Sequence, residues 1–140
     1  MVKKILTFSA AALLCSCGSD RNLAEVHFVL SNRLNSKIHI ILDETTDNEI
    51  RKTDGQYRIF VSPSGVVRVK SLEPLLQRHI QMVNFEGGAS VPIIGPSSHS
   101  DRRYWWNLGE EVIDGATTRL IFAVATRDGI SKVDTFALVR

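Results

Sequence analysis

The two cysteines of this 140-residue chain, Cys15 and Cys17, are the first residues that could do chemistry, because they lie one residue apart in the segment ALLCSCGSDRN. A disulfide between residues this close is disfavoured, since the bond requires separations and torsions that a Cys-x-Cys segment does not readily reach. A zinc site needs further ligands, and the chain has no second cysteine pair. The remaining chemistry for a cysteine here is covalent modification of its thiol.

The residues before the cysteines have the pattern of a secretory signal. Lys3 and Lys4 form a short positive region, and residues 5–14 form an apolar stretch. A membrane-spanning helix needs roughly 20 apolar residues, so this stretch is too short to cross a bilayer. We therefore expect residues 1–16 to be a signal peptide that is removed from the mature protein.

The segment Leu14-Cys15-Ser16-Cys17 resembles the bacterial lipobox. In that motif an aliphatic residue lies three positions before the cysteine that receives lipid, and a small residue lies directly before it. Ser16 is small enough for the peptidase pocket in front of Cys17, whereas Leu14 would fit poorly in front of Cys15. We therefore expect cleavage after Ser16 and lipid on Cys17. An ordinary cleaved signal that contains cysteines is the alternative.

Removal of the signal changes the charge of the chain. The full sequence has 17 basic and 15 acidic residues, and residues 1–16 contain two of the basic residues and none of the acidic ones. The mature chain then has no net formal charge, which argues against a nucleic-acid partner. It has no cysteine besides Cys17, so a single domain at 25–140, after a polar tether at 17–24, must be held together by packing without disulfides.

Two histidines lie in the middle of predicted strands, His27 in EVHFVL and His39 in KIHIIL. If these strands pair as a hairpin, the two rings face each other, and Asp43 or Glu25 is available as a third metal ligand. Two histidines without a clear third ligand are a weak signal for zinc. The alternative is that both histidines face solvent on the outer face of a sheet, and we expect no metal.

The segment Arg102-Arg103-Tyr104-Trp105-Trp106 is the best candidate for a partner-binding surface. In a strand, Tyr104 and Trp106 point to one face and Trp105 points to the other. Tryptophan, tyrosine and arginine are the residue types most enriched at binding hot spots. The alternative is that one tryptophan fills the core while the long loop before the segment shields the other.

Other polar clusters do not form a catalytic pattern. One loop contains Ser97, Ser98, His99 and Asp101, but catalytic partners normally converge from separate elements. The chain has no Gly-x-Ser-x-Gly elbow and no phosphate-binding glycine loop. An acidic group, Glu110, Glu111 and Asp114, lacks the spaced ligands of a calcium loop. We therefore expect neither enzyme activity nor a cofactor.

The elements that must position these residues are strands, because apolar and polar residues alternate along most of the chain. Strands are predicted at 25–30, 37–42, 56–61, 66–70, 79–85 and 102–108, with two more within 118–139 and one short helix at 73–78. This pattern predicts an all-β fold of seven to eight mostly antiparallel strands with at most one short helix. A single β-sandwich or a small barrel is the expected architecture.

The segments between the strands contain turn-forming residues. SNRLNS at 31–36 is predicted to close a hairpin between the first two strands, and SPSG at 62–65 is predicted to form a tight turn. Asp128-Gly129 lies between the last two apolar segments and favours a type I′ hairpin turn.

Part of this pattern resembles a family of uncharacterised bacterial lipoproteins. The matching features are an aliphatic strand that ends in Asp, a strand with the pattern Asp-Gly-x-Tyr-x-Ile, and a Pro-x-Gly-Val turn. The matching residues are Asp43, Asp54, Gly55, Tyr57, Ile59, Pro63, Gly65 and Val66. The resemblance implies a compact β-sandwich of the transthyretin-like or immunoglobulin-like kind. It implies no site residue, because the family has no established activity.

These observations together predict a membrane-anchored bacterial lipoprotein of the cell envelope. Its expected role is that of a non-catalytic binding or accessory module with an envelope protein or glycan as partner, and its expected location is the outer membrane, facing the periplasm. Two alternatives are a small periplasmic protein that binds metal or another ligand, or catalyses a reaction, through His27 and His39, and an accessory lipoprotein of the pilot type in a secretion machine.

Overall fold

The computed structural model describes residues 23–34, 37–95, 99 and 101–133. The predicted signal, Cys17, residues 97–98 and the predicted strand beyond residue 133 lie outside the described residues. Within the described ranges, no helix is long and apolar enough to cross a membrane.

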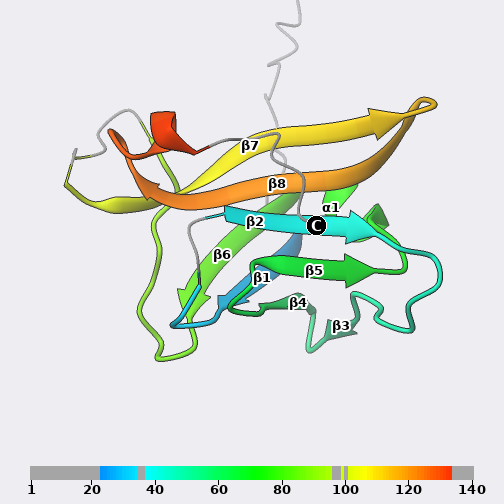
Figure 1. Cartoon of the computed structure of the whole chain (residues 1–140). Helices are drawn as coiled ribbons and strands as arrows, with labels where there is room; N and C mark the ends of the chain where they lie inside the picture. The colour runs from blue at the N-terminus through cyan, green and yellow to red at the C-terminus, as the bar shows by residue number, and fades with distance from the viewer. Residues whose placement is uncertain (1–22, 35–36, 96–98, 100, 134–140) are drawn as a thin grey trace, which may run out of the picture.

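Strands dominate the described residues and form two four-stranded sheets (Figure 1). Sheet A has the order β3-β4-β1-β6, with β3 at Lys52–Thr53, β4 at Gln56–Val61, β1 at Ala24–Leu30 and β6 at His79–Phe85. Sheet B has the order β5-β2-β8-β7, with β5 at Val66–Val69, β2 at Lys37–Leu42, β8 at Ala116–Thr126 and β7 at Arg103–Ile113. A short helix, α1 at Glu73–Leu76, precedes β6, and a 3₁₀ turn, η2 at Ile130–Lys132, follows β8. The general prediction of an all-β fold is confirmed.

The pairing directions differ from the prediction. β1 runs parallel to both β4 and β6, and β2 runs parallel to β5, whereas β3–β4, β2–β8 and β7–β8 are antiparallel. Both sheets are therefore mixed, and the expectation of mostly antiparallel strands is wrong. The physical reason is that alternation along a strand reports which side chains share a face but carries no information about the direction of the neighbouring strand.

The predicted hairpin at 31–36 does not form, because β1 belongs to sheet A and β2 to sheet B. The turn at 62–65 also carries the chain from one sheet to the other, from β4 to β5. The backbone N–H of Gly65 donates to the carbonyl of Ser62 (2.9 Å), and the carbonyl of Gly65 accepts from the N–H of His39 (2.7 Å). Gly65 has φ of 73°, and a Cβ at this position would overlap the carbonyl oxygen of Lys37. Only glycine fits this close approach of two backbones.

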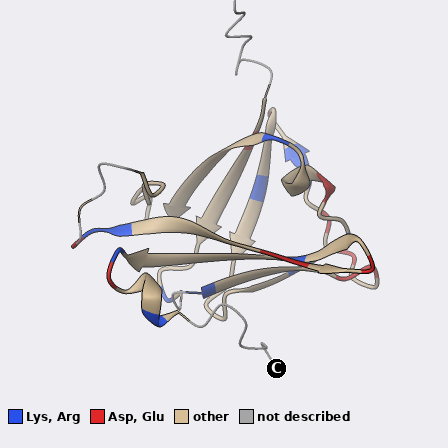
Figure 2. Ribbon diagram, turned by 90° about the horizontal axis from the view of Figure 1, so that it is seen from above, with Lys and Arg blue, Asp and Glu red and all other residues tan. Residues whose placement is uncertain are grey.

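The core lies between the inner faces of the two sheets, whose strands run in clearly different directions (Figures 1 and 2). The predicted inward faces are confirmed at β1, where Val26, Phe28 and Leu30 are fully buried. Phe28 lies 4.8 Å from Trp105 and 5.5 Å from Phe122, measured between ring centroids. This aromatic cluster joins β1 of sheet A to β7 and β8 of sheet B.

The two sheets are connected along one side. The N–H of Val91 donates to the carbonyl of Val83 in β6 (2.8 Å), and the N–H of Trp105 in β7 donates to the carbonyl of Pro92 (2.9 Å). The segment 91–94 thus bridges the edges of sheets A and B. On the other side no ladder joins β4 to β5 in the described chain, so the sheets do not close into the small barrel that was one of the expected architectures.

Asp-Gly turns form at two places, but not at the predicted one. Asp114 and Gly115 connect β7 to β8 with positive φ at both residues, as a type I′ turn requires. Gly129 instead has φ of −70°, and its N–H donates to Oγ1 of Thr126 (3.0 Å). This bond turns the chain into η2, so the type I′ turn predicted at 128–129 is wrong. The other Asp-Gly turn, at 54–55, connects β3 to β4.

The middle of the chain follows the prediction closely. The expected helix at 73–78 is present as the shorter α1, and the expected strand at 79–85 coincides with β6. The strand expected at 102–108 is present as the start of β7, which continues to Ile113 in a longer hairpin.

Candidate functional site

The arginine and aromatic segment at 102–106 lies at the start of β7, which begins at Arg103, and its most apolar side chains are buried. Trp105 is 1% exposed and stacks on Phe122, with 4.8 Å between ring centroids. Its indole Nε1 donates to Oε1 of Gln81 on β6 (3.0 Å). Tyr104 is also buried, and its hydroxyl accepts from the N–H of His99 (2.7 Å). Burial therefore removes Tyr104 and Trp105 from any surface that a partner can contact.

The accessible part of this segment consists of Arg102, Arg103 and half-buried Trp106. The indole Nε1 of Trp106 donates to the carbonyl of Ala125 (2.9 Å), which fixes the ring along β8. The guanidinium of Arg103 donates to the carbonyl of Val124 (3.3 Å). Arg103 lies on the same strand face as Trp105, and its guanidinium is 6.0 Å from the ring centroid of Phe85 on β6. The accessible groups therefore lie on both faces of β7, which is an edge strand of sheet B. We call Arg102, Arg103 and Trp106 the β7 surface.

The two histidines lie on opposite outer surfaces of the domain. His27 points outward from sheet A, and its Nε2 donates to Oδ1 of Asn84 (2.9 Å). His39 points outward from sheet B, where it is 1% exposed. The alternative in which His27 and His39 face each other and share a metal ion is therefore wrong, because the core separates the two rings. No group of three or more metal-ligating side chains occurs among the residues that the structure describes.

His39 is a buried histidine whose ring nitrogens make no hydrogen bond. Desolvation, together with the positive charges of Lys37 and Arg119, lowers the pKa of His39 from 6.5 to about 4. The ring is therefore neutral at physiological pH. Sequence reasoning placed this side chain on a solvated face, because nothing in KIHIIL distinguishes an exposed outer face from a covered one.

The acidic residues of the β7–β8 hairpin take part in interactions within the hairpin. Glu111 forms an ion pair with Arg119, whose side chain is 8% exposed. Oε2 of Glu110 accepts from the hydroxyl of Thr117 (2.8 Å), and Asp114 occupies the left-handed position of the turn. These three residues are therefore spread along the hairpin rather than gathered around one point.

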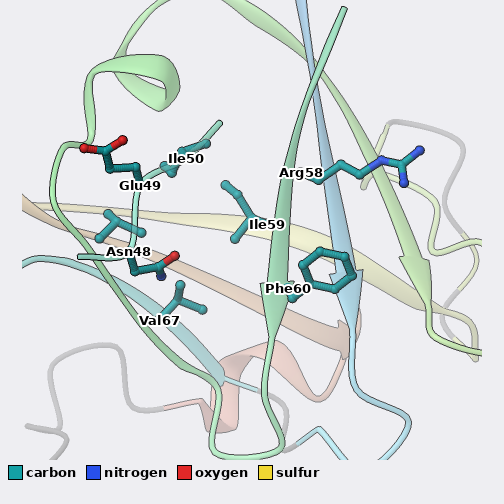
Figure 3. Close-up of a pocket in the computed structure, with 8 residues that line it drawn as sticks. Asn48, Glu49, Ile50, Arg58, Ile59, Phe60 and Val67 are labelled. Atoms are coloured by element: carbon teal, nitrogen blue, oxygen red, sulfur yellow. The ribbon is translucent and has the colours of Figure 1, made fainter. Parts of the chain in front are cut away.

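Between β4 and β5, where the sheets are not joined, a small cavity opens to the surface (Figure 3). Its volume is ≈ 140 Å³, and the side chains of Ile50, Ile59 and Val67 line its apolar part. Ligand pockets usually measure roughly 300–1,000 Å³, so this cavity is too small for an organic cofactor. Glu49 at the rim forms ion pairs with Arg51 (3.7 Å) and Lys70 (3.8 Å). Sequence reasoning missed the cavity because its lining comes from two sheets and a loop.

The residues that carry the resemblance to uncharacterised lipoproteins have structural roles here. Oδ1 of Asp43 accepts from the hydroxyl (2.6 Å) and the N–H (3.0 Å) of Thr45, and these bonds lower the pKa of the Asp43 carboxyl. Gly55 provides the positive φ of the β3–β4 turn, and Gly65 permits the passage between the sheets. The shared pattern thus describes turns and does not point to a reactive site.

No family model matches the chain, and no curated protein matches its sequence. Among solved structures, a similar chain is a crystal structure described as a "putative lipoprotein" from Bacillus anthracis. The TM-score is 0.46 and the identity is 5%, over 84% of this chain and 82% of that chain. A likeness at this level carries no argument about the activity of this protein.

Proposed function

We propose that this protein is a lipoprotein of the bacterial cell envelope and that its β domain is a non-catalytic binding or accessory module. The supporting observation is the position of the lipobox-like cysteine relative to the fold. Cys17 lies seven residues before Ala24, where β1 begins, and β1 is a central strand of sheet A. A lipid on Cys17 thus attaches the domain to a membrane through a short polar tether.

The anchor proposed for Cys17 is a diacylglyceryl thioether together with an amide-linked acyl chain. A single acyl chain gives only marginal membrane binding, whereas several chains hold a protein stably. Gly18 follows the modified cysteine and is not an acidic residue of the kind that retains enterobacterial lipoproteins at the inner membrane. We therefore propose the outer membrane, with the domain in the periplasm.

The partner-binding role is assigned to the β7 surface. Its arginines and indole edge offer charge-assisted hydrogen bonds and flat apolar contact, which suit an acidic protein surface or the polar and apolar faces of a glycan. Trp106 is held in place by its bond to the carbonyl of Ala125, so little side-chain freedom is lost when a partner binds.

The anchor is tested by the intact mass of the protein extracted from membranes. Wild type and a matched Cys15→Ser variant should have the same mass, that of a chain that begins at an acylated Cys17, because residue 15 is removed with the signal. Cys17→Ser should lose the acyl mass. An unmodified Cys17 in wild type, or cleavage at another residue, would contradict the proposal.

The β7 surface is tested by cross-linking in intact membranes. Trp106→Ala should lose a cross-linked adduct that wild type forms, because the indole edge is part of the contact. The matched control is Ile113→Ala, which removes an apolar side chain that is 53% exposed at the tip of the hairpin. If Trp106→Ala keeps every adduct of wild type, the partner binds elsewhere.

A further inference from the structure

A second exposed surface lies on sheet A, on the face opposite the core. The side chains of β4, β1 and β6 that alternate with the core residues form this surface, which we call the sheet A face. Phe60 is 67% exposed, Met82 is 42% exposed and Ile80 is 38% exposed. The strand register places Phe60 beside Val29 and Met82 beside His27. Three large apolar side chains therefore share one exposed face, although buried and exposed side chains alternate normally along each of the two strands that carry them.

Several polar side chains of the sheet A face are already hydrogen-bonded to each other. Nε2 of Gln56 donates to Oε2 of Glu25 (2.6 Å), and Nε2 of His27 donates to Oδ1 of Asn84 (2.9 Å). A polar group that keeps its hydrogen bond costs much less to move away from water than an unpaired one. These bonds lower the cost of bringing Gln56, His27 and Asn84 close to an apolar phase, whereas the carboxyl group of Glu25, in the row nearest the start of β1, has to remain at the level of the hydrated headgroups.

The direction of the strands brings this face close to the proposed anchor. β1, β4 and β6 are parallel, so all three begin at the same end of the sheet, the end at which β1 starts at Ala24 (Figure 2). The seven residues from Cys17 to Ala24 can span at most roughly 25 Å when fully extended. Ile80 lies opposite Glu25 near the start of β1, and Phe60 lies opposite Val29, four residues further along β1. At about 3.3 Å per residue, these two positions are about 13 Å apart along the strands. The whole face is therefore within reach of the bilayer that holds Cys17.

From these observations we propose that the sheet A face is a membrane-contact surface. Ile80, Met82 and Phe60 enter the interfacial region of the bilayer, and Arg58, in the middle row of the same face, extends its stem toward the lipid phosphates. The lipid on Cys17 makes this contact effectively intramolecular, so a weak apolar contact is sufficient. This inference rests on the proposed lipid anchor and is separate from the β7 surface, whose residues lie at the start of β7 in sheet B.

The inference is tested with single thiols on the full acylated protein. The mature chain has no free thiol, because Cys17 carries the lipid, so Met82→Cys and Phe60→Cys each give one labelling site. The matched control is Ile113→Cys, a similarly exposed apolar residue on the β7–β8 hairpin. Each protein is labelled with bimane and reconstituted into vesicles of phosphatidylethanolamine and phosphatidylglycerol, with or without brominated acyl chains. Circular dichroism of each labelled protein checks that the fold is intact.

We expect the brominated lipids to quench bimane at positions 60 and 82 at least twofold more than at position 113. Equal quenching at all three positions, or none at 60 and 82, would overturn the membrane-contact surface. The intact mass of the same samples separates this failure from that of the anchor. An acylated protein without quenching at 60 and 82 leaves the anchored module standing, whereas a protein without acyl chains overturns both proposals.

Discussion

The two adjacent tryptophans of β7 should respond very differently to truncation. Trp105 is 1% exposed, whereas Trp106 is half-buried on the other face of the same strand. Trp105→Ala removes the central ring of the aromatic cluster, which contacts both Phe28 and Phe122 at 4.8 Å between centroids. It also leaves Oε1 of Gln81 without its indole donor.

The size of the effect follows from these contacts. Truncation of a buried tryptophan to alanine costs about 3–5 kcal/mol, and the two aromatic contacts and the hydrogen bond place Trp105→Ala near the upper end. Trp106→Ala should cost about 1 kcal/mol, because it removes a half-exposed ring and one hydrogen bond. Domains are stable by about 5–15 kcal/mol, so the first variant loses a large fraction of its stability and the second keeps most of it.

The assay is urea unfolding followed by far-ultraviolet circular dichroism, which does not depend on tryptophan fluorescence. With a slope of about 2 kcal/mol per molar urea, Trp105→Ala should lower the midpoint by about 2–2.5 M. Trp106→Ala should lower it by about 0.5 M. Trp105→Phe keeps a ring in the cluster and should lie between the two. If Trp106→Ala is as destabilising as Trp105→Ala, the assignment of Trp105 to the core and of Trp106 to the β7 surface is refuted.

Two further predictions concern stability. Gly65→Ala should cost at least about 3 kcal/mol in urea unfolding, because the overlap of a Cβ with the carbonyl of Lys37 adds to the strain of positive φ. The matched Gly55→Ala has positive φ but no atom within 4 Å of the added Cβ, and should cost only about 1–2 kcal/mol; equal costs would show that the backbone contact is unimportant. For His39, the unfolded chain binds a proton near pH 6.5 and the folded chain only near pH 4. The free energy of unfolding should therefore fall by about 3 kcal/mol as pH falls through this window. His39→Leu should remove that part of the pH dependence. If the pH profile of unfolding is the same in this variant as in wild type, the low pKa of buried His39 is contradicted.

Local features of the fold were predictable because they depend on residues close together in the chain. The alternation in EVHFVL correctly placed Val26, Phe28 and Leu30 on the core face, since side chains on a strand alternate with a period of two. The same rule correctly separated Trp105 from Trp106. The strand predicted after the short helix coincides with β6, and Pro74 lies in the first turn of α1, where a proline is tolerated.

The features that failed depend on contacts between distant segments. The hairpins expected at 31–36 and 128–129 were argued from turn residues alone, and the chain instead crosses between sheets at the first and enters η2 at the second. An Asp-Gly pair permits a type I′ turn but does not require one. Thr126 supplies a competing hydrogen bond to the N–H of Gly129, and that bond decides the conformation.

For the candidate site, too, the local features were predictable and the contacts between distant segments were not. The types of residue at 102–106 identified a segment rich in binding groups, but only the packed structure shows which of them remain accessible. Trp105 is buried because β6 and β8 supply Gln81 and Phe122 around it, and neither neighbour is adjacent in sequence. The sheet A face escaped notice for a related reason: its apolar residues belong to different strands and become neighbours only through parallel pairing.

The sequence by itself determined the lipobox-like motif, the absence of disulfides in the predicted mature chain and the inward or outward direction of most strand side chains. These properties follow from covalent chemistry and from the twofold period of an extended backbone. The tertiary structure alone decided the partners and directions of the strands, the opposite positions of His27 and His39, and the burial of Trp105. Those properties depend on which surfaces meet in space. The stability of such contacts depends on both segments together, and the sequence of one segment does not determine which other segment packs against it.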